Sequence, residues 1–254
     1  MKTFSRICYR FLYFWVRLIY RKYTVDGVEN LPDEPCIVAG NHSQTHGPLS
    51  CEFYFPDDKG IWAASEMFEL KKVPAYAFKD FWSDKPKWTQ WFFKILSYLI
   101  APLAVLLFNN AHTIPVYRGQ KIMTTMKTTV ARMEEGANIV IFPEHDEPYN
   151  HILQGFQEGF VDVARLYCRR SGKGVCFVPM YVCPTLRKLY ILKPIAFDPT
   201  APIQEERKRI CAYLMEAISE KADSLPLHAT FGYRKSLNTY NRPLEEKTNE
   251  EAGR

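Results

Sequence analysis

The sequence lacks the features that define several large protein classes. Its seven cysteines are odd in number, never form a Cys-x-x-Cys pair and mostly lie in apolar runs, which argues against a disulfide framework and indicates reduced core thiols. No basic run belongs to a nucleic-acid-binding module, and the formal charge of +5 is modest, so nucleic acid is not a predicted partner. Arg6, Arg10 and Arg17 interrupt each N-terminal apolar stretch long enough for a secretory signal, so no export is expected.

What the sequence does contain is typical of a globular protein with an excess of aromatic residues. Of the 254 residues, 47% are hydrophobic, 24% are charged and 15% are aromatic. This length suits a single α/β domain with a large core. We predict an N-terminal helix at 1–24, the α/β domain at 25–237 and a disordered tail at 238–254, because the tail is polar and broken by proline.

The N-terminal segment predicts an amphipathic helix with one basic side. At ~100° per residue, the basic residues fall within an arc of roughly 100° and the apolar residues fill the opposite side. The basic set is Lys2, Arg6, Arg10, Arg17 and Arg21, and the apolar set is Phe4, Ile7, Phe11, Phe14, Trp15, Leu18 and Ile19. A helix packed on the domain with a solvated basic edge would show the same pattern. Because the apolar side is so aromatic, we expect it to lie at a membrane interface.

The rest of the chain alternates between apolar strand patterns and helical patterns. This alternation predicts the α/β class, with a mixed central sheet flanked by helices. Residues 91–108 are the most apolar stretch and approach the ~18 residues of a membrane-spanning helix. Pro102 would disrupt the middle of such a helix, so we expect two apolar helical pieces there, buried or dipped into one leaflet.

Polar side chains that are able to do chemistry follow three predicted strands. His42 and His46 come after the apolar run at 36–40, Glu144 and Asp146 follow the strand at 138–143, and Arg118 follows the strand at 113–117. Ligand sites in α/β sheets gather beyond the carboxyl ends of strands. A histidine, carboxylates and an arginine that meet at one edge would suit acyl transfer to an anionic alcohol.

These residues carry a resemblance to a known family. The stretch NHSQTHGPL resembles the first block of the PlsC-like glycerophospholipid acyltransferases, a histidine followed after four residues by an aspartate. The stretches TIPVYR, FPEHD and FVPMYV resemble their second, third and fourth blocks, in the family's order, within residues 41–182. The resemblance implies a glycerolipid acyltransferase-like fold and transfer of a fatty acyl group to a lysophosphatidate-like acceptor.

By this resemblance His42 is the general base, and Arg118 and Glu144 bind the acceptor, Arg118 through its phosphate and Glu144 through a glycerol hydroxyl or by local ordering. The chain departs from the pattern where the aspartate would stand, because Gly47 occupies that position. We therefore expect Asp146, or less readily Glu144, to orient His42 in its place. His46 is expected to contact the substrate or to accept a hydrogen bond from His42.

The resemblance also implies partners and a location. The expected donor is acyl-CoA or acyl-carrier protein, which enters as a substrate, and no bound cofactor or metal is expected. The expected surface is the cytoplasmic face of the cell membrane, where the protein is peripheral or monotopic.

Two alternatives stay open. Gly47 also fits a catalytically weakened relative that binds lipid. The spacing of His42 and His46, with Glu144, His145, Asp146 and His151, fits a metal-dependent hydrolase, although no His-Glu-x-x-His pattern supports it.

Overall fold

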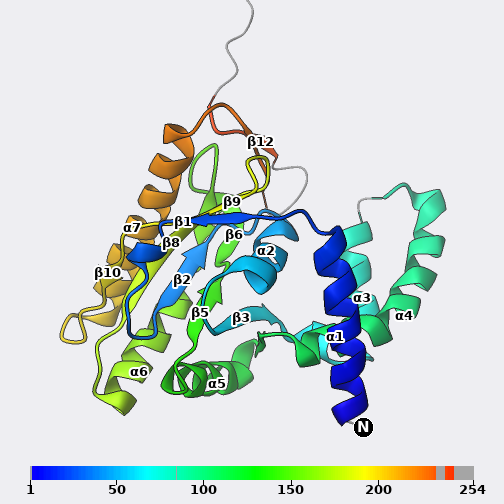
Figure 1. Cartoon of the computed structure of the whole chain (residues 1–254), viewed down its shortest axis with the longest axis horizontal. Helices are drawn as coiled ribbons and strands as arrows, with labels where there is room; N and C mark the ends of the chain where they lie inside the picture. Colours follow the sequence, from blue (N-terminus) through cyan, green and yellow to red (C-terminus); the bar gives the residue numbers. More distant parts are fainter. Residues whose placement is uncertain (1, 84, 233–237, 243–254) are drawn as a thin grey trace, which may run out of the picture.

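A mixed eight-stranded sheet forms the centre of the molecule, in the order β1-β9-β8-β2-β5-β3-β4, with β10 paired to β8 (Figure 1). The computed structural model describes residues 2–83, 85–232 and 238–242. The strands of this sheet are β1 (Thr24–Asp26), β2 (Ile37–Gly40), β3 (Lys59–Ala64), β4 (Thr113–Val116), β5 (Asn138–Ile141), β8 (Cys176–Cys183), β9 (Lys188–Ile191) and β10 (Ile195–Ala196). All neighbours run parallel except β8 with β9 and with β10. The predicted class, α/β with a mixed sheet, is confirmed.

Helices cover both faces of this sheet. The α-helices are α1 (Lys2–Ile19), α2 (His46–Tyr54), α3 (Val73–Ala77), α4 (Lys87–Asn110), α5 (Ile122–Glu134), α6 (Asp162–Ser171) and α7 (Ile203–Ser224). Shorter helical turns are η1 (Val28–Asn30), η2 (Ser65–Phe68), η3 (Phe78–Trp82, a π-helix), η4 (Gly119–Lys121) and η5 (Glu158–Val161). Two small hairpins pair β6 (Glu144–Pro148) with β7 (Gln154–Phe156) and β11 (Ala229–Thr230) with β12 (Thr239–Tyr240).

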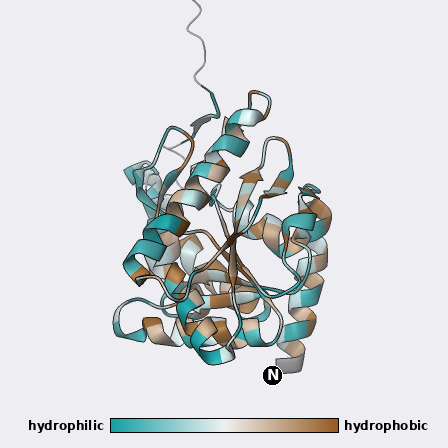
Figure 2. Cartoon of the chain, turned by 90° about the vertical axis from the view of Figure 1, so that its left-hand side faces the viewer, coloured by the Kyte–Doolittle hydropathy of each residue, from teal (hydrophilic) through white to brown (hydrophobic). Residues whose placement is uncertain are grey.

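Alternation along the strands divides the apolar residues between two cores. In β2, Ile37 and Ala39 pack with residues of α5, α6 and α7, whereas Val38 packs on the opposite face with residues of α2. In β8, Phe177 and Val178 are divided in the same way. This follows from the two-residue period of a strand, which sends successive side chains to opposite faces. Figure 2 shows the hydrophobic strands enclosed between the helices.

The apolar segment at 91–108 lies within one continuous helix, α4, so the prediction of two pieces is wrong. Proline removes one backbone hydrogen bond, but the helix continues through Pro102. Its buried residues are small, and Ala101 and Ala104 pack with Val73 and Ala77 of α3. Among the described residues, α4 is the one helix whose length and composition would let it cross a membrane.

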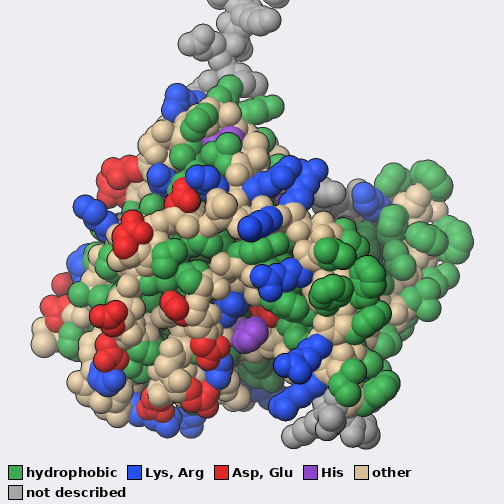
Figure 3. Space-filling model, viewed as in Figure 1, with side chains coloured by type: hydrophobic (Ala, Val, Ile, Leu, Met, Phe, Trp, Pro, Cys, Tyr) green, Lys and Arg blue, Asp and Glu red, His purple; other side chains and the backbone are tan. Residues whose placement is uncertain are grey.

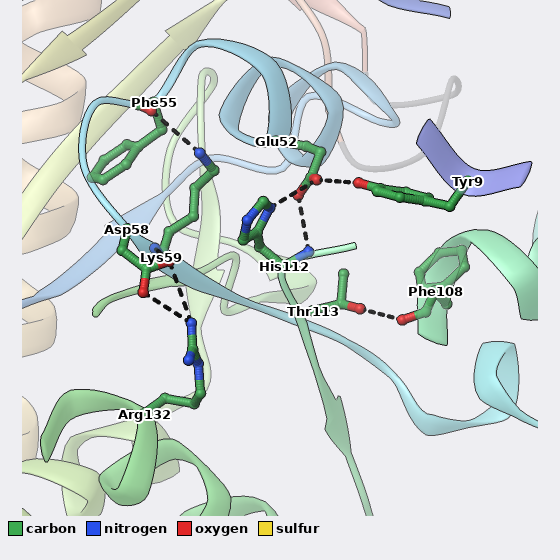
Figure 4. A network of polar contacts seen from close by, with 9 residues as sticks. All are labelled: Tyr9, Glu52, Phe55, Asp58, Lys59, Phe108, His112, Thr113 and Arg132. Carbon is green, nitrogen blue, oxygen red and sulfur yellow. Dashed lines mark hydrogen bonds and ion pairs between the residues drawn. The ribbon is translucent and has the colours of Figure 1, made fainter. Parts of the chain in front are cut away.

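The side chain of Tyr9 joins helix α1 to the domain (Figure 4). The hydroxyl of Tyr9 donates to Glu52 Oε1 over 2.7 Å, and the backbone N–H of His112 donates to Glu52 Oε2 over 3.3 Å. Nδ1 of His112 lies 3.0 Å from Oε1 of the same carboxylate. One carboxylate of α2 therefore joins α1 to the start of β4. The predicted N-terminal helix is confirmed as a helix, and it ends at Ile19.

The ordered domain extends beyond the predicted boundary at residue 238. Strand β12 pairs with β11, and Asn241 is fully buried. Its side-chain amide donates to the carbonyl of Ala222 over 2.8 Å, and its Oδ1 accepts from the backbone N–H of His228 over 2.9 Å. These bonds secure the chain against the end of α7. The remainder of the predicted tail, 243–254, lies outside the described residues.

Candidate active site

The four motif segments end at one edge of the sheet. Strands β2, β4, β5 and β8 are parallel within the sheet, so their carboxyl ends lie at the same edge. His42 follows β2, Glu144 follows β5 and begins β6, and Arg118 follows β4. Because β2 lies between β5 and β8, His42 occupies the middle of this edge. The sequence prediction that these groups share an edge is confirmed.

Asn41 fixes the start of the motif loop against β8. Its side-chain oxygen accepts from the backbone N–H of Val182 over 2.7 Å, and its side-chain nitrogen donates to the Val182 carbonyl over 3.0 Å. The same nitrogen donates to Ser43 Oγ over 2.8 Å. The amide of Asn41 thus continues the β2–β8 hydrogen bonding beyond the last strand residue, which places His42 at a defined point of the edge.

The loop then turns sharply through two residues in the left-handed region. Ser43 and Gln44 have φ values of 46° and 58°, which non-glycine residues seldom adopt. After this turn the backbone N–H of Gly47 donates to the His42 carbonyl over 3.1 Å. The local strain is maintained by the surrounding bonds, as at many functional loops.

The imidazole of His42 has a buried nitrogen without a partner. Nδ1 is buried and accepts or donates no hydrogen bond, while the ring packs edge-on against Phe142 with centroids 5.4 Å apart. Burial lowers the pKa of His42 below its ordinary value, and the backbone of Gln44 and the charge of Asp80 oppose this effect. His42 is therefore neutral at neutral pH, which is the form that accepts a proton.

Glu144 binds the backbone of the motif loop rather than the imidazole. Its Oε2 accepts from the backbone N–H of His42 over 2.5 Å, and its Oε1 accepts from the backbone N–H of Gln154 over 3.2 Å. Burial raises the pKa of Glu144 to about 7, although these two bonds act in the opposite direction. Of the two roles considered for Glu144, this geometry fits local ordering.

The backbone at Gly47 is too closely surrounded to carry a side chain. A Cβ atom at this position would lie 2.5 Å from the His42 carbonyl oxygen and 2.8 Å from Cε1 of Phe142. Both distances are shorter than real Cβ contacts allow. An aspartate at position 47 would therefore displace the loop that carries His42.

The structure does not form the predicted contact between Asp146 and Nδ1 of His42, because that nitrogen has no hydrogen-bond partner. Asp146 lies in β6 and its side chain is exposed. Strand β6 continues beyond Glu144 in a hairpin with β7, and Glu144 is the acidic residue of this cluster whose carboxylate bonds to the loop. The carboxylate whose charge acts on His42 is Asp80 in η3.

His46 lies away from His42, on the side of β8 and α1. The hydroxyl of Tyr20 is 3.4 Å from its Nδ1, and its ring lies 5.9 Å from that of Phe231. Burial and the charge of Arg21 lower the pKa of His46. Within the described part of the chain, no group of three or more His, Cys, Asp or Glu side chains is placed to hold a metal ion. The alternative metal site is therefore not assembled.

Arg118 interacts electrostatically with a tyrosine that the sequence did not indicate as part of the site. Its side chain is exposed after β4, and its charge acts on Tyr76 of α3. Burial and the carboxylates of Asp80 and Glu66 raise the pKa of Tyr76, whereas Arg118 lowers it. The segment after β3 thus contributes a tyrosine on which Arg118 and two carboxylates act. No motif marks these residues, whereas Asn41 could have been suspected from its place directly before His42.

We expect the pH dependence of stability to report on Glu144. A carboxyl group whose pKa is raised from 4.5 to about 7 keeps a proton in the folded state that the unfolded chain releases. Its stabilising contribution is complete below about pH 4.5 and is lost as the pH rises to about 7, by up to about 3 kcal/mol. Urea unfolding of wild type and Glu144→Gln at both ends of this range measures the difference.

The matched control for this measurement is Glu147→Gln, because Glu147 lies exposed on the same strand. We expect Glu147→Gln to retain the wild-type slope with pH and Glu144→Gln to lose it. Equal slopes in all three proteins would show that Glu144 titrates as an ordinary surface carboxylate.

Comparison with solved structures finds proteins of similar fold. The chain is similar to the crystal structure of the 1-acyl-sn-glycerophosphate (LPA) acyltransferase PlsC from Thermotoga maritima, with 16% sequence identity and a TM-score of 0.44. The match covers 86% of this chain and 78% of that protein. No protein-family model matches the chain, and no curated protein matches it. The residue roles proposed below rest on the geometry of this chain.

Proposed function

We propose that the chain transfers a fatty acyl group from acyl-CoA or acyl-carrier protein to the hydroxyl of a lysophosphatidate-like acceptor, with His42 as general base. The observation that carries this proposal is the position of the His42 imidazole, with its buried Nδ1 that has no hydrogen-bond partner, at the middle of the edge where four motif strands end. An imidazole in this state suits proton abstraction from an alcohol.

In the proposed reaction the acceptor oxygen attacks the carbonyl carbon of the acyl thioester while His42 takes the hydroxyl proton. The tetrahedral intermediate then collapses, the carbon–sulfur bond breaks, and the leaving thiolate takes the proton from the imidazolium. No acyl-enzyme is required, and the chain returns to its starting protonation state. Glu144 and Asn41 hold the loop in place during these steps. Glu144 accepts from the backbone N–H of His42, and the side chain of Asn41, the preceding residue, accepts from the backbone N–H of Val182.

The positive imidazolium needs a negative charge nearby, and Asp80 supplies it in this proposal. The charge of Asp80 favours the protonated form of His42, which is the effect that the absent aspartate at position 47 would have had. Asp80 also acts on Tyr76, which Arg118 influences in turn. In this proposal Arg118 binds the phosphate of the acceptor, because its guanidinium is exposed at the same edge of the sheet.

A membrane surface is the proposed partner for the exposed apolar residues of α1 and α4. Most of the large apolar side chains of α1 are exposed, as are Arg6, Arg10 and Arg17, while the hydroxyl of Tyr9 bonds to the domain. In Figure 3 hydrophobic side chains cover the lobe formed by α1, α3 and α4, and a column of Lys and Arg borders it. The exposed set is Phe4, Ile7, Phe11, Phe14, Trp15, Val16, Leu18, Ile19, Trp88, Trp91, Phe92, Ile95, Tyr98, Leu99 and Leu103.

Singly scattered apolar residues are normal on a protein surface, whereas a contiguous apolar patch indicates an interaction site. The basic residues beside this patch could bind anionic lipid headgroups. We therefore propose that the chain is a peripheral or monotopic protein of the cytoplasmic face of the cell membrane. A single-chain lipid would then reach the site from the bilayer surface.

Vesicle flotation tests the membrane proposal. We expect the double variant Trp91→Ala/Leu99→Ala to bind vesicles of mixed anionic and zwitterionic phospholipid about thirtyfold more weakly than wild type, since each lost side chain removes roughly 1 kcal/mol of apolar burial. The matched control is Leu227→Ala/Tyr240→Ala, which removes exposed apolar residues outside α1 and α4. Equal weakening in the two double variants would contradict the assignment of this surface.

An acyl-transfer assay on the detergent-purified chain tests the reaction itself. Palmitoyl-CoA and lysophosphatidate are the first substrate pair, followed by carrier-protein donors and other lysophospholipids. A second candidate function, a lipid-binding relative without turnover, is favoured by one observation, the absence of a carboxylate bonded to Nδ1 of His42. Calorimetric binding of lysophosphatidate with no transfer from any donor would select that candidate.

A further inference from the structure

A pocket lies beside the turn that follows β8. It has a volume of about 590 Å³, within the range of small-molecule sites. Its walls come from the end of α1, the start of α2 and the turn after β8. The residues that matter for its chemistry are Val16, Ile19, Arg21, His46, Thr185 and Phe231. His42 does not line it.

The polar side of this pocket is suited to an anion. Arg21 is exposed, and none of the ion pairs or hydrogen bonds found among the described residues engages its guanidinium. His46 and the hydroxyl-bearing Thr185 complete the polar side. A guanidinium without a carboxylate partner, next to an imidazole, offers donors that phosphate groups accept, whereas the Thr185 hydroxyl donates to the Ala229 carbonyl over 2.9 Å.

The apolar side of the pocket is continuous with the outward face of α1. Val16 and Ile19 line the pocket and also belong to the exposed residues of that helix, with Ile19 80% exposed. Phe231 closes the opposite wall and contacts the ring of His46. A ligand in this space therefore meets a cation at one end and an apolar helix face at the other. That combination matches an anionic amphiphile rather than a small polar anion.

We propose that this pocket binds the phosphate-bearing headgroup of a lipid through Arg21 and His46, with the acyl chain directed along the apolar face of α1. The site is separate from the transfer centre at His42, and it does not depend on acyl transfer. It would hold an anionic lipid at the point where α1 meets the domain.

Calorimetric titration of the full-length chain tests the proposal in an Arg118→Gln background, which removes the phosphate contact proposed for the transfer centre, and without any acyl donor. The probes are hexanoyl lysophosphatidate, hexanoyl lysophosphatidylcholine and inorganic phosphate. We expect the lysophosphatidate to bind most tightly, and Arg21→Gln to raise its Kd at least about tenfold, as the loss of a charge-assisted hydrogen bond implies. Lys22→Gln is the matched control, because Lys22 is the exposed neighbouring cation and does not line the pocket.

A third variant separates the lipid from free phosphate. We expect Ile19→Ala to weaken lysophosphatidate several-fold and to leave the binding of inorganic phosphate unchanged. If inorganic phosphate binds as tightly as lysophosphatidate, the pocket is a simple anion site and the lipid proposal is overturned. If Arg21→Gln and Lys22→Gln weaken binding equally, the attraction is that of the whole basic surface, and the proposal is also overturned. Because the background lacks the Arg118 contact and no acyl donor is present, none of these results depends on whether the chain is an acyltransferase.

Discussion

Replacement of His42 with alanine is expected to lower acyl transfer by about a hundredfold to ten-thousandfold, the usual contribution of a positioned general base. The variant should remain folded, because the contacts that position the loop come from Asn41, Glu144 and the backbone of Gly47 rather than from the imidazole. The initial rate with palmitoyl-CoA and lysophosphatidate is the measurement, and circular dichroism confirms the fold.

The pH dependence of the wild-type rate gives a second readout of the same residue. The reaction requires neutral His42, and burial lowers its pKa, so transfer should persist at pH values below the ordinary histidine range and fall only when the imidazole is protonated. The control variant is His145→Ala, because His145 lies beside Glu144 and packs on Gly155 instead of the loop. Transfer in His42→Ala within a factor of about ten of wild type would remove His42 as the base.

A side chain at position 47 is expected to damage the chain instead of improving it. Gly47→Ala should lower the free energy of unfolding by about 1–3 kcal/mol, because the added Cβ meets the His42 carbonyl and the ring of Phe142. Gly47→Asp should cost more, since it adds a carboxylate to the same crowded space. Displacement of His42 by about 1 Å would reduce transfer about a hundredfold, so the aspartate of the family pattern would not restore activity.

Gly174→Ala is the matched control, because a Cβ atom at Gly174 would meet nothing within 4 Å. Thermal unfolding measures both variants, and each kcal/mol corresponds to about 2–4 °C in Tm for a chain of this size. A Gly47→Asp protein as stable as wild type and more active would show that the loop readily accommodates a carboxylate, against the packing described above.

The sequence was sufficient to predict the strand ends that make the site. Hydrophobic runs bounded by turn residues located β2, β4, β5 and β8, and the parallel arrangement brought His42, Glu144 and Arg118 to one edge. The helix at the N-terminus followed from its 3.6-residue period. These features depend on local pattern, which a single sequence contains.

The remaining features depend on contacts between distant elements. Asp80 acts on His42 from η3, and no spacing rule connects the two residues. The single helix α4 tolerates Pro102, although the local rule predicts a break, since its small residues pack closely on α3. The orientation of β6, which carries Asp146 outward, is set by its hairpin with β7.

The position of β2 between β5 and β8 also has a consequence for biosynthesis. The bonds that fix the loop join residues 102 and 141 positions apart in the chain, so they form only after most of the protein has been made. Helices α1 and α4 leave the ribosome well before β8, with their apolar sides exposed. A nascent chain therefore presents its most aggregation-prone surfaces before its sheet exists, and early contact with a bilayer or a chaperone would favour correct folding.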